Sequence, residues 1–303
     1  MPSAPRARRA PTVAAEPVTD AHLHLWDLAE SPYAWLAGAP TPLRRTVGID
    51  EVRGPLGELG VTRVVLVQAD DTAEDTAHLQ RTARAIEGGA GAGIMRADVV
   101  GWLPLTDPDA VRAALADPQR TDHLVGVRHL VHDDPDPGLL DRPEVARSLD
   151  LLAEAGLPLD VPDAFERHME QVVRVARRHP GLTVVLDHLG KPPLGDDEAM
   201  ARWRAQLEAI AACPNVVAKV SGLATSGNGD FAAAADLALA LFGPERLMIG
   251  SDWPIAPQHL DLGSGFAPLL AHVRSWAQAD VRALTQGTAA RVYRRLGEAS
   301  STA

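Results

Sequence analysis

Two histidines that alternate along one short apolar run constrain this chain more than any other feature of its sequence. His22 and His24 lie two residues apart in the run at 18–25. Side chains of a strand point alternately to its two faces, so both imidazoles project from the same side as Asp20. Imidazoles about 7 Å apart along a strand can converge on a metal ion or on a substrate carbonyl. The alternative is a core strand with two inert, hydrogen-bonded histidines, and the residues downstream decide between these interpretations.

Short apolar runs recur along the chain and are rich in Val, Leu and Ile, as expected for buried parallel strands. Eight such runs are found, at 18–25, 63–68, 99–103, 124–130, 157–161, 183–188, 216–220 and 247–250. Segments with helical spacing of apolar residues lie between several of them, at 75–86, 147–155, 167–178 and 200–212. Eight alternations of strand and helix in about 250 residues are typical of a (β/α)8 barrel.

A doubly wound open sheet also alternates strands and helices, but its first strand ends in a glycine-rich phosphate-binding turn. Here the first run ends in His-Leu-Trp-Asp at 24–27, which favours the barrel. We therefore predict the α/β class and a distorted, single-domain (β/α)8 TIM barrel over residues 17–296. The segments 1–16 and 297–303 lack apolar periodicity and are predicted to be flexible tails.

The composition excludes several classes of function. Hydrophobic residues make up 46% of the 303 residues, which is enough for a large core. The formal net charge of −11 disfavours nucleic acid and anionic membrane surfaces as partners. No apolar run reaches the roughly 18 residues that a membrane-spanning helix needs. The single cysteine, Cys213, cannot form an internal disulfide, which favours a cytoplasmic protein. The sequence does not set the oligomeric state, and a homo-oligomer stays open.

Polar side chains interrupt nearly every apolar run at its C-terminal end. They are His22, His24, Gln68, Arg128, His129, Asp160, Asp187, His188, Lys219, Ser221, Ser251 and Asp252. A barrel of this kind carries its chemistry at the C-terminal ends of its strands. Because unpaired charges are costly to bury, we expect these side chains to line one shared pocket.

Several segments together resemble the amidohydrolase superfamily, in particular its lactonase branch, which acts on sugar-acid, pyrone-dicarboxylate and muconolactone-type lactones. The resemblance runs in order from about residue 18 to residue 295. Its motifs are DAHLHLWD at 20–27, YAWL at 33–36, VGW at 100–102, GVRH at 126–129, LDHLGKP at 186–192, KVSGL at 219–223 and FGPERLMIGSDWP at 242–254. The last of these is the longest and the most specific.

This resemblance implies lactone hydrolysis, which needs an activated water, a stabilised oxyanion and a proton for the departing alkoxide. Asp252 matches the general base of the superfamily, and a helix N-cap is the alternative role for it. His22, His24 and His188 would polarise the carbonyl, either directly or through a metal. The fifth run has no histidine, which disfavours the two-metal centre of many amidohydrolases. His22, His24, His188 and Asp252 could therefore hold one divalent ion at most, with Zn²⁺ suiting the nitrogen-rich set, and a metal-independent reaction stays open.

Further residues are candidates with structural alternatives. Arg128 and His129 are neighbours on one strand, so only one of them should reach the pocket. An arginine there could bind an oxyanion or a substrate carboxylate. The alternative role for each residue is an ion pair that stabilises the fold. Lys191 is a candidate for hydrogen bonding to substrate hydroxyls, with a solvated loop lysine as the alternative. Lys219 is interpreted as structural. The predicted substrate-binding residues are Tyr33, Trp35, Gln68, Trp102, Lys191 and Trp253, with core packing as the alternative for the aromatic ones. The remaining histidines, His132 among them, receive no catalytic role.

The sequence therefore predicts a cytoplasmic lactonase whose partner is a small lactone, most simply a sugar-acid lactone. Two other functions stay open. One is a metal-dependent amidohydrolase or decarboxylase of the same fold that acts on a carboxylated ring. The other is a sugar-binding barrel without catalysis. No Gly-x-Ser-x-Gly elbow is found, which disfavours serine hydrolase chemistry.

Overall fold

The computed structural model describes residues 16–89, 93–255 and 262–298, and within them eight parallel strands pair in the order of the chain. A bridge between Leu23 and Trp253 joins the first strand to the segment after the last. The predicted single-domain (β/α)8 barrel is confirmed. The strands are β1 (Val18–Leu23), β2 (Val61–Val67), β3 (Arg96–Gly101), β4 (Leu124–Arg128), β5 (Leu159–Val161), β6 (Val184–Leu186), β7 (Val216–Val220) and β8 (Leu247–Ile249).

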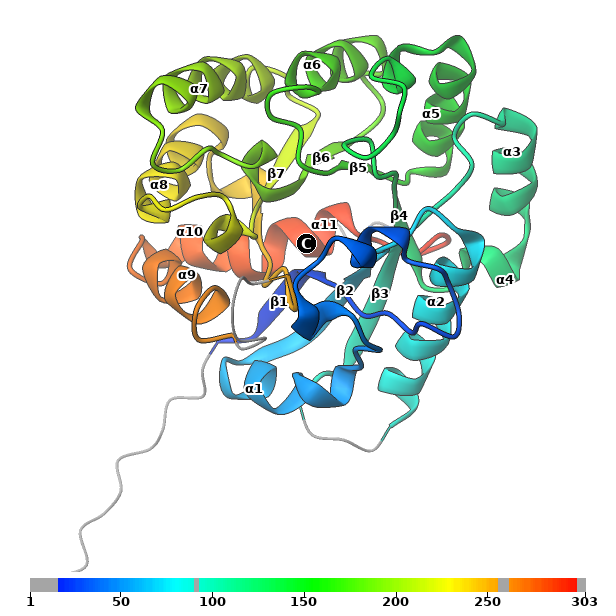
Figure 1. Ribbon diagram of the computed structural model, residues 1–303, viewed down its shortest axis with the longest axis horizontal. Helices are drawn as coiled ribbons and strands as arrows, with labels where there is room; N and C mark the ends of the chain where they lie inside the picture. Colours follow the sequence, from blue (N-terminus) through cyan, green and yellow to red (C-terminus); the bar gives the residue numbers. More distant parts are fainter. Residues whose placement is uncertain (1–15, 90–92, 256–261, 299–303) are drawn as a thin grey trace, which may run out of the picture.

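Most helices surround these strands on the outside of the barrel, whereas α11 (Thr288–Val292) lies behind its centre (Figure 1) and packs Ala289 and Val292 against the inner valines. The helices are α1 (Arg53–Glu58), α2 (Ala73–Gly88), α3 (Pro108–Ala116), α4 (Pro118–Thr121), α5 (Pro143–Ala155), α6 (Met169–Arg178), α7 (Asp197–Ala211), α8 (Phe231–Phe242), α9 (Phe266–Val273), α10 (Gln278–Arg282) and α11 (Thr288–Val292). Among the described residues, no helix has the length and hydropathy needed to cross a membrane.

Side-chain alternation along the strands divides the core into two parts. Val65 and Val67 of β2 belong to a small cluster inside the barrel, whereas their neighbours Val64 and Leu66 pack in the larger cluster between strands and helices. The inner cluster consists mainly of valines and includes the fully buried Tyr293, which follows α11. A strand that is buried on both faces needs apolar residues at successive positions, and this explains the continuous apolar runs of the sequence.

The ends of the elements follow local signals in some places and long-range packing in others. Asp107 caps α3 by accepting a hydrogen bond from the backbone nitrogen of Ala110 at 3.1 Å, and Gly156 ends α5 with a left-handed φ of 72°. The run at 183–188, predicted as one strand, leaves β6 after Leu186. His188 and Leu189 then adopt positive φ values of 55° and 54°, which turn the chain sharply over Asp187–Gly190. His188 therefore lies in a tight turn after the strand.

Most of the two predicted tails lies outside the described residues, at 1–15 and 299–303. The described ends of both segments contact the barrel. Glu16 lies 3.3 Å from Arg282, and Glu298 pairs with Arg96 at 3.0 Å. The proposed domain limits stay a prediction.

Candidate active site

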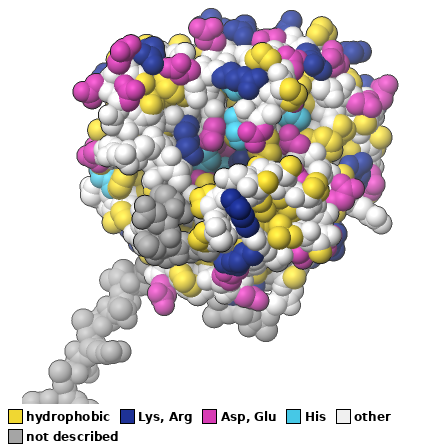
Figure 2. Space-filling model, viewed as in Figure 1, with side chains coloured by type: hydrophobic (Ala, Val, Ile, Leu, Met, Phe, Trp, Pro, Cys, Tyr) yellow, Lys and Arg dark blue, Asp and Glu magenta, His cyan; other side chains and the backbone are white. Residues whose placement is uncertain are grey.

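Polar side chains from several strands meet in a hollow on the face of the barrel that carries the C-terminal ends of the strands. Figure 2 shows histidine, acidic and basic side chains gathered near the centre of this face. The pocket has a volume of about 160 Å³. Its lining consists of His24, Trp35, Ala69, Arg128, Leu130, His132, Asp133, Asp163, His188, Lys191, Asp252 and Ile255.

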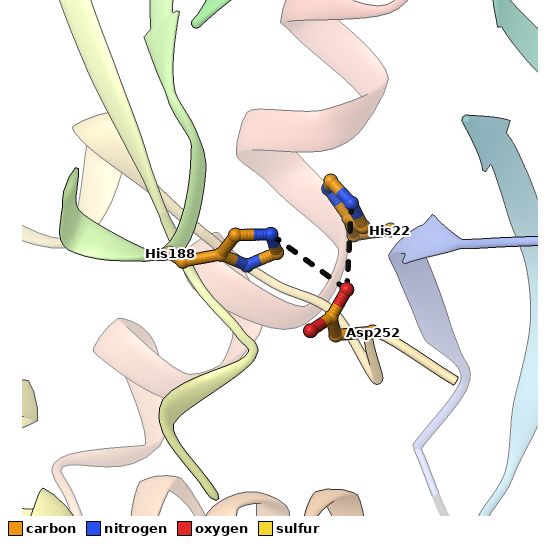
Figure 3. Close-up of side chains that lie close together, drawn as sticks. All are labelled: His22, His188 and Asp252. Atoms are coloured by element: carbon orange, nitrogen blue, oxygen red, sulfur yellow. Dashed lines mark ion pairs between the residues drawn. The ribbon is translucent and has the colours of Figure 1, made fainter. Parts of the chain in front are cut away.

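The carboxylate of Asp252 lies at the centre of the site, surrounded by three imidazoles. Its Oδ1 lies 3.7 Å from Nε2 of His22, 3.5 Å from Nε2 of His24 and 3.6 Å from Nε2 of His188. Figure 3 shows that the rings of His22 and His188 approach this oxygen from different elements. The Nε2 atoms of His22 and His24 are 3.0 Å apart, so the two imidazoles of β1 and its extension converge. All four side chains are at least 95% buried.

Backbone constraints hold these groups in place. Oδ1 of Asp20 accepts hydrogen bonds from the backbone nitrogens of His22 at 3.1 Å and Ser251 at 2.8 Å, and so ties β1 to the loop after β8. Asp252 itself has a left-handed φ of 56°, which a side chain rarely adopts and which is often retained at functional sites. Nδ1 of His188 bonds to the hydroxyl of Ser221 at 2.8 Å, which leaves Nε2 directed at Asp252.

A buried charge network lies beneath His22. Nζ of Lys219 is 3.0 Å from Nδ1 of His22, 3.0 Å from Oδ1 of Asp187 and 2.6 Å from Oδ2 of Asp160. The latter oxygen also accepts a hydrogen bond from the hydroxyl of Tyr293 at 2.6 Å. Every member is fully buried or nearly so, and the carboxylates compensate the lysine charge. Lys219 thus lies within the fold rather than in the pocket lining.

Electrostatics separate the roles of the acid and the imidazoles. Burial by itself would raise the pKa of Asp252, but the surrounding His188, His24 and His22 outweigh it and hold this pKa well below its usual range. Burial lowers the pKa of His188, against the opposing effect of Asp252. It also lowers the pKa of His22, and the nearby Lys219 acts in the same direction. At neutral pH the site therefore contains an ionised carboxylate next to neutral His22 and His188 rings.

The donor set fits a divalent metal ion. One ligand atom each from His22, His188 and Asp252 lies within 4.8 Å of the others. Donors about 2.0–2.1 Å from a tetrahedral Zn²⁺ lie about 3.4 Å from one another, and the separations of 3.5–3.7 Å around Asp252 Oδ1 are close to this value. His24 brings a fourth donor, because its Nδ1 bonds to the carbonyl oxygen of Val67 at 2.8 Å and its Nε2 faces the group. Such a carbonyl partner is typical behind a metal-binding imidazole.

The structure places the neighbours Arg128 and His129 on different sides. Arg128 lines the pocket and its Nη1 lies 3.0 Å from Nε2 of His22 and 3.2 Å from Oδ2 of Asp187. His129 does not line this pocket. Its Nδ1 accepts a hydrogen bond from Nε1 of Trp102 at 3.2 Å, and its Nε2 lies 3.3 Å from Asp71. Alternation along β4 gives the physical reason for this division.

Some of the other predicted substrate-binding residues line the pocket and some do not. Trp35 and Lys191 line the pocket. Tyr33, Gln68 and Trp253 are buried and lie outside its described lining, and Trp102 faces a separate groove by α2. The hydroxyl of Tyr33 bonds to Asp75 at 2.6 Å, so its polar group is engaged in the fold. None of these four side chains lines the described pocket, and their role in substrate binding stays a prediction.

Sequence reasoning missed His132, Asp133 and Asp163, which line the pocket. A signal was present, since Asp163 comes two residues after the end of β5 and His132 comes four after the end of β4. Loop residues so close to strand ends fall on the functional face of a barrel. Asp187 was noted as a strand-end residue, but its pairing with Lys219 and Arg128 depends on three different strands.

Comparison with known proteins agrees with this geometry. The model of a family described as amidohydrolase matches residues 19–295. An L-fucono-1,5-lactonase of Burkholderia multivorans is 34% identical over 294 residues, which cover 90% of this chain and 95% of that protein. An L-fucono-1,5-lactonase of Burkholderia ambifaria is 32% identical, with 78% and 80% covered. A crystal structure of an amidohydrolase from B. multivorans with bound Zn superposes with a TM-score of 0.78 at 32% identity, covering 91% of this chain and 99% of that one.

Proposed function

This chain belongs to the amidohydrolase family, and on that basis we propose that it hydrolyses a sugar-acid lactone. The observation that carries the proposal is the ionised Asp252 carboxylate, which three imidazoles surround in a pocket at the C-terminal ends of the strands. Identity of 34% over most of its length to an L-fucono-1,5-lactonase supports the choice of a lactone as substrate. The pocket, about 160 Å³ in volume, suits a single small ring rather than a polymer.

Asp252 acts as the general base in this proposal. Its carboxylate accepts a proton from the attacking water, while the water oxygen forms a bond to the lactone carbonyl carbon. The low pKa of Asp252 makes it hold that proton weakly. It therefore releases the proton readily to the ring oxygen when the C–O bond breaks, so that the hydroxy acid leaves and the carboxylate is restored.

Arg128 stabilises the negative charge that develops on the carbonyl oxygen. Its cationic guanidinium lines the pocket, and Asp187 fixes its position at 3.2 Å. The neutral imidazoles of His22 and His188 restrict the same region and direct their Nε2 atoms towards it. Trp35 contributes an apolar wall for the face of the ring.

A single divalent metal ion would be held by His22, His188 and Asp252, with His24 beside them. Because most of these donors are nitrogen atoms, Zn²⁺ is the ion that they favour. Such an ion supplies Lewis acidity, which polarises a carbonyl oxygen and lowers the pKa of water. The buried Lys219 and Asp187 beneath His22 keep its ring orientation fixed whether or not an ion is present.

The experiment that tests the function is a pH-indicator assay with aldonolactones, pyrone dicarboxylate and muconolactone, run with the purified protein before and after chelator treatment. We expect acid release from at least one aldonolactone and a loss of at least 100-fold in kcat for Asp252→Asn. The matched control is Asp109→Asn, which neutralises an exposed carboxylate in the first turn of α3 and should leave the rate unchanged. Activity on none of the lactones, loss of CO₂ from a carboxylated ring, or ligand binding without turnover would each refute the proposal.

A further inference from the structure

Asp163 and Lys191 form one wall of the pocket, and neither is part of the group around Asp252. Asp163 follows β5 and Lys191 follows the tight turn after β6. Nζ of Lys191 lies 3.9 Å from Oδ2 of Asp163 and donates a hydrogen bond to Oγ1 of Thr225 at 2.8 Å. The side chains of Lys191 and Asp163 are 25% and 32% exposed, so both charged groups reach the pocket while part of each stem is buried.

The backbone at both positions is unusual for residues with side chains. Asp163 has a φ of 39° and Lys191 a φ of 68°, values in the left-handed region where glycine is the residue of least cost. The fold alone would be served by glycine at these two places. Left-handed residues with side chains cluster at functional sites, and here both line the same pocket.

The charges of the pocket indicate which chemistry this wall accepts. The described lining contains three carboxylates, from Asp133, Asp163 and Asp252, and two cations, from Arg128 and Lys191. Arg128 already bonds to the buried Asp187, and Lys191 faces Asp163. Neither cation is thus free for a carboxylate of the substrate, and the excess of acidic groups in the lining would repel a lactone with one or two carboxylates. A neutral, hydroxylated ring would find an acceptor in Asp163 and a donor in Lys191, since a hydroxyl can both donate and accept.

We propose that Asp163 and Lys191 are a specificity-determining pair that binds hydroxyl groups of the lactone and disfavours lactones with carboxylate substituents. The inference rests on the proposed function. It assigns the selection of the substrate to Asp163 and Lys191, whereas the groups around Asp252 carry out the reaction. Hydrogen bonds to charged groups strengthen the binding of a matching hydroxyl, and an analogue that lacks the hydroxyl does not form them.

The test compares two six-membered lactones, L-fucono-1,5-lactone and δ-valerolactone, which has no hydroxyls, in Asp163→Asn and Lys191→Met variants. Asn also tolerates left-handed backbone, so Asp163→Asn removes the charge without changing the turn. We expect each variant to lower kcat/KM for the hydroxylated lactone by about 10-fold to 100-fold and for δ-valerolactone by less than about threefold. Glu166→Gln is the matched control, because its carboxylate lies in the same loop but pairs with the exposed Arg202 at 2.7 Å.

Equal losses on both lactones would overturn the proposal, because they would indicate a structural role. Unchanged rates on both would overturn it as well. A higher kcat/KM of the wild type on 2-pyrone-4,6-dicarboxylate than on the hydroxylated lactone would contradict the charge argument. Failure of the proposed function is distinct from these outcomes, since the wild type would then hydrolyse none of the three compounds and the specificity proposal would fall with it.

Discussion

Substitution of Gly222 by alanine should misplace the two groups at the centre of the site without removing either of them. Gly222 begins the turn after β7 with a φ of 62°. A Cβ at this position would lie 2.6 Å from Nδ1 of His188 and 2.7 Å from Oδ2 of Asp252. Both distances are well below van der Waals contact, and neither neighbour is the end of a flexible chain. The imidazole and the carboxylate must therefore move by several tenths of an ångström.

The expected effect has two parts. A left-handed alanine costs about 1–2 kcal/mol of stability through its backbone alone. The steric conflict adds to this and shifts the reacting groups, and a displacement on the order of 1 Å can cost about 100-fold in rate. We expect Gly222→Ala to lower kcat/KM on the lactone substrate by at least tenfold. Binding of Zn²⁺, measured by titration calorimetry, should weaken in parallel, because His188 and Asp252 are two of the proposed ligands.

Gly156→Ala separates these two parts. Gly156 ends α5 with a similar φ of 72°, but its Cβ would meet no atom within 4 Å. It should lose about the same 1–2 kcal/mol in urea unfolding and keep full activity. Wild-type activity in Gly222→Ala, or an equal loss of activity in Gly156→Ala, would refute the reasoning that the glycine keeps the site in register.

Three further changes test the buried charges and the metal. Lys219→Met should lower the free energy of unfolding by about 3–5 kcal/mol in urea titrations, because it leaves Asp160 and Asp187 without their cation, and a loss below about 1 kcal/mol would contradict this role. Burial raises the pKa of Asp75 to about 7, so its proton is held more tightly in the folded chain and the fold loses stability as pH rises from about 4 to 7. Between pH 5 and pH 8 the wild type should thus lose about 3 kcal/mol more than Asp75→Asn, and parallel pH profiles would show that Asp75 is ionised throughout. Chelation followed by addition of Zn²⁺ should remove and restore a shift of several degrees in the melting temperature, a shift that Asp252→Asn should reduce.

The strands and the barrel could be predicted because their signals are local. A strand buried on both faces must be apolar at successive positions, and the eight runs reflect that requirement directly. The C-terminal strand ends could also be predicted as the location of the site, since His22 lies near the end of one apolar run, His188 ends another and Asp252 follows a third. Alternation further required Arg128 and His129 to face different ways, although it could not say which of them faces the pocket.

The predicted roles of Tyr33 and Trp253 illustrate what local signals leave open. An aromatic residue near a strand end can line the pocket or fill the space behind it, and both are almost fully buried here. Tyr33 is turned inward by its bond to Asp75, which is 42 residues away in the sequence. That choice depends on how the loop after β1 packs against α2, and no short segment contains this information.

By itself, the sequence determined the eight strands of the barrel, the face that carries the chemistry and the four residues His22, His24, His188 and Asp252 as its candidates. Periodicity is enough for the strands and for their ends, because it depends on neighbours in the chain, whereas the choice of these four among the strand-end residues rested on the resemblance to the amidohydrolase superfamily. Only the tertiary structure decided that Arg128 reaches the pocket, that Lys219 lies beneath His22, and that Asp163 and Lys191 share a wall. Each of these contacts joins loops or strands from different parts of the chain. Left-handed turns and long-range packing set the geometry of the contacts, and local sequence patterns do not encode either of these.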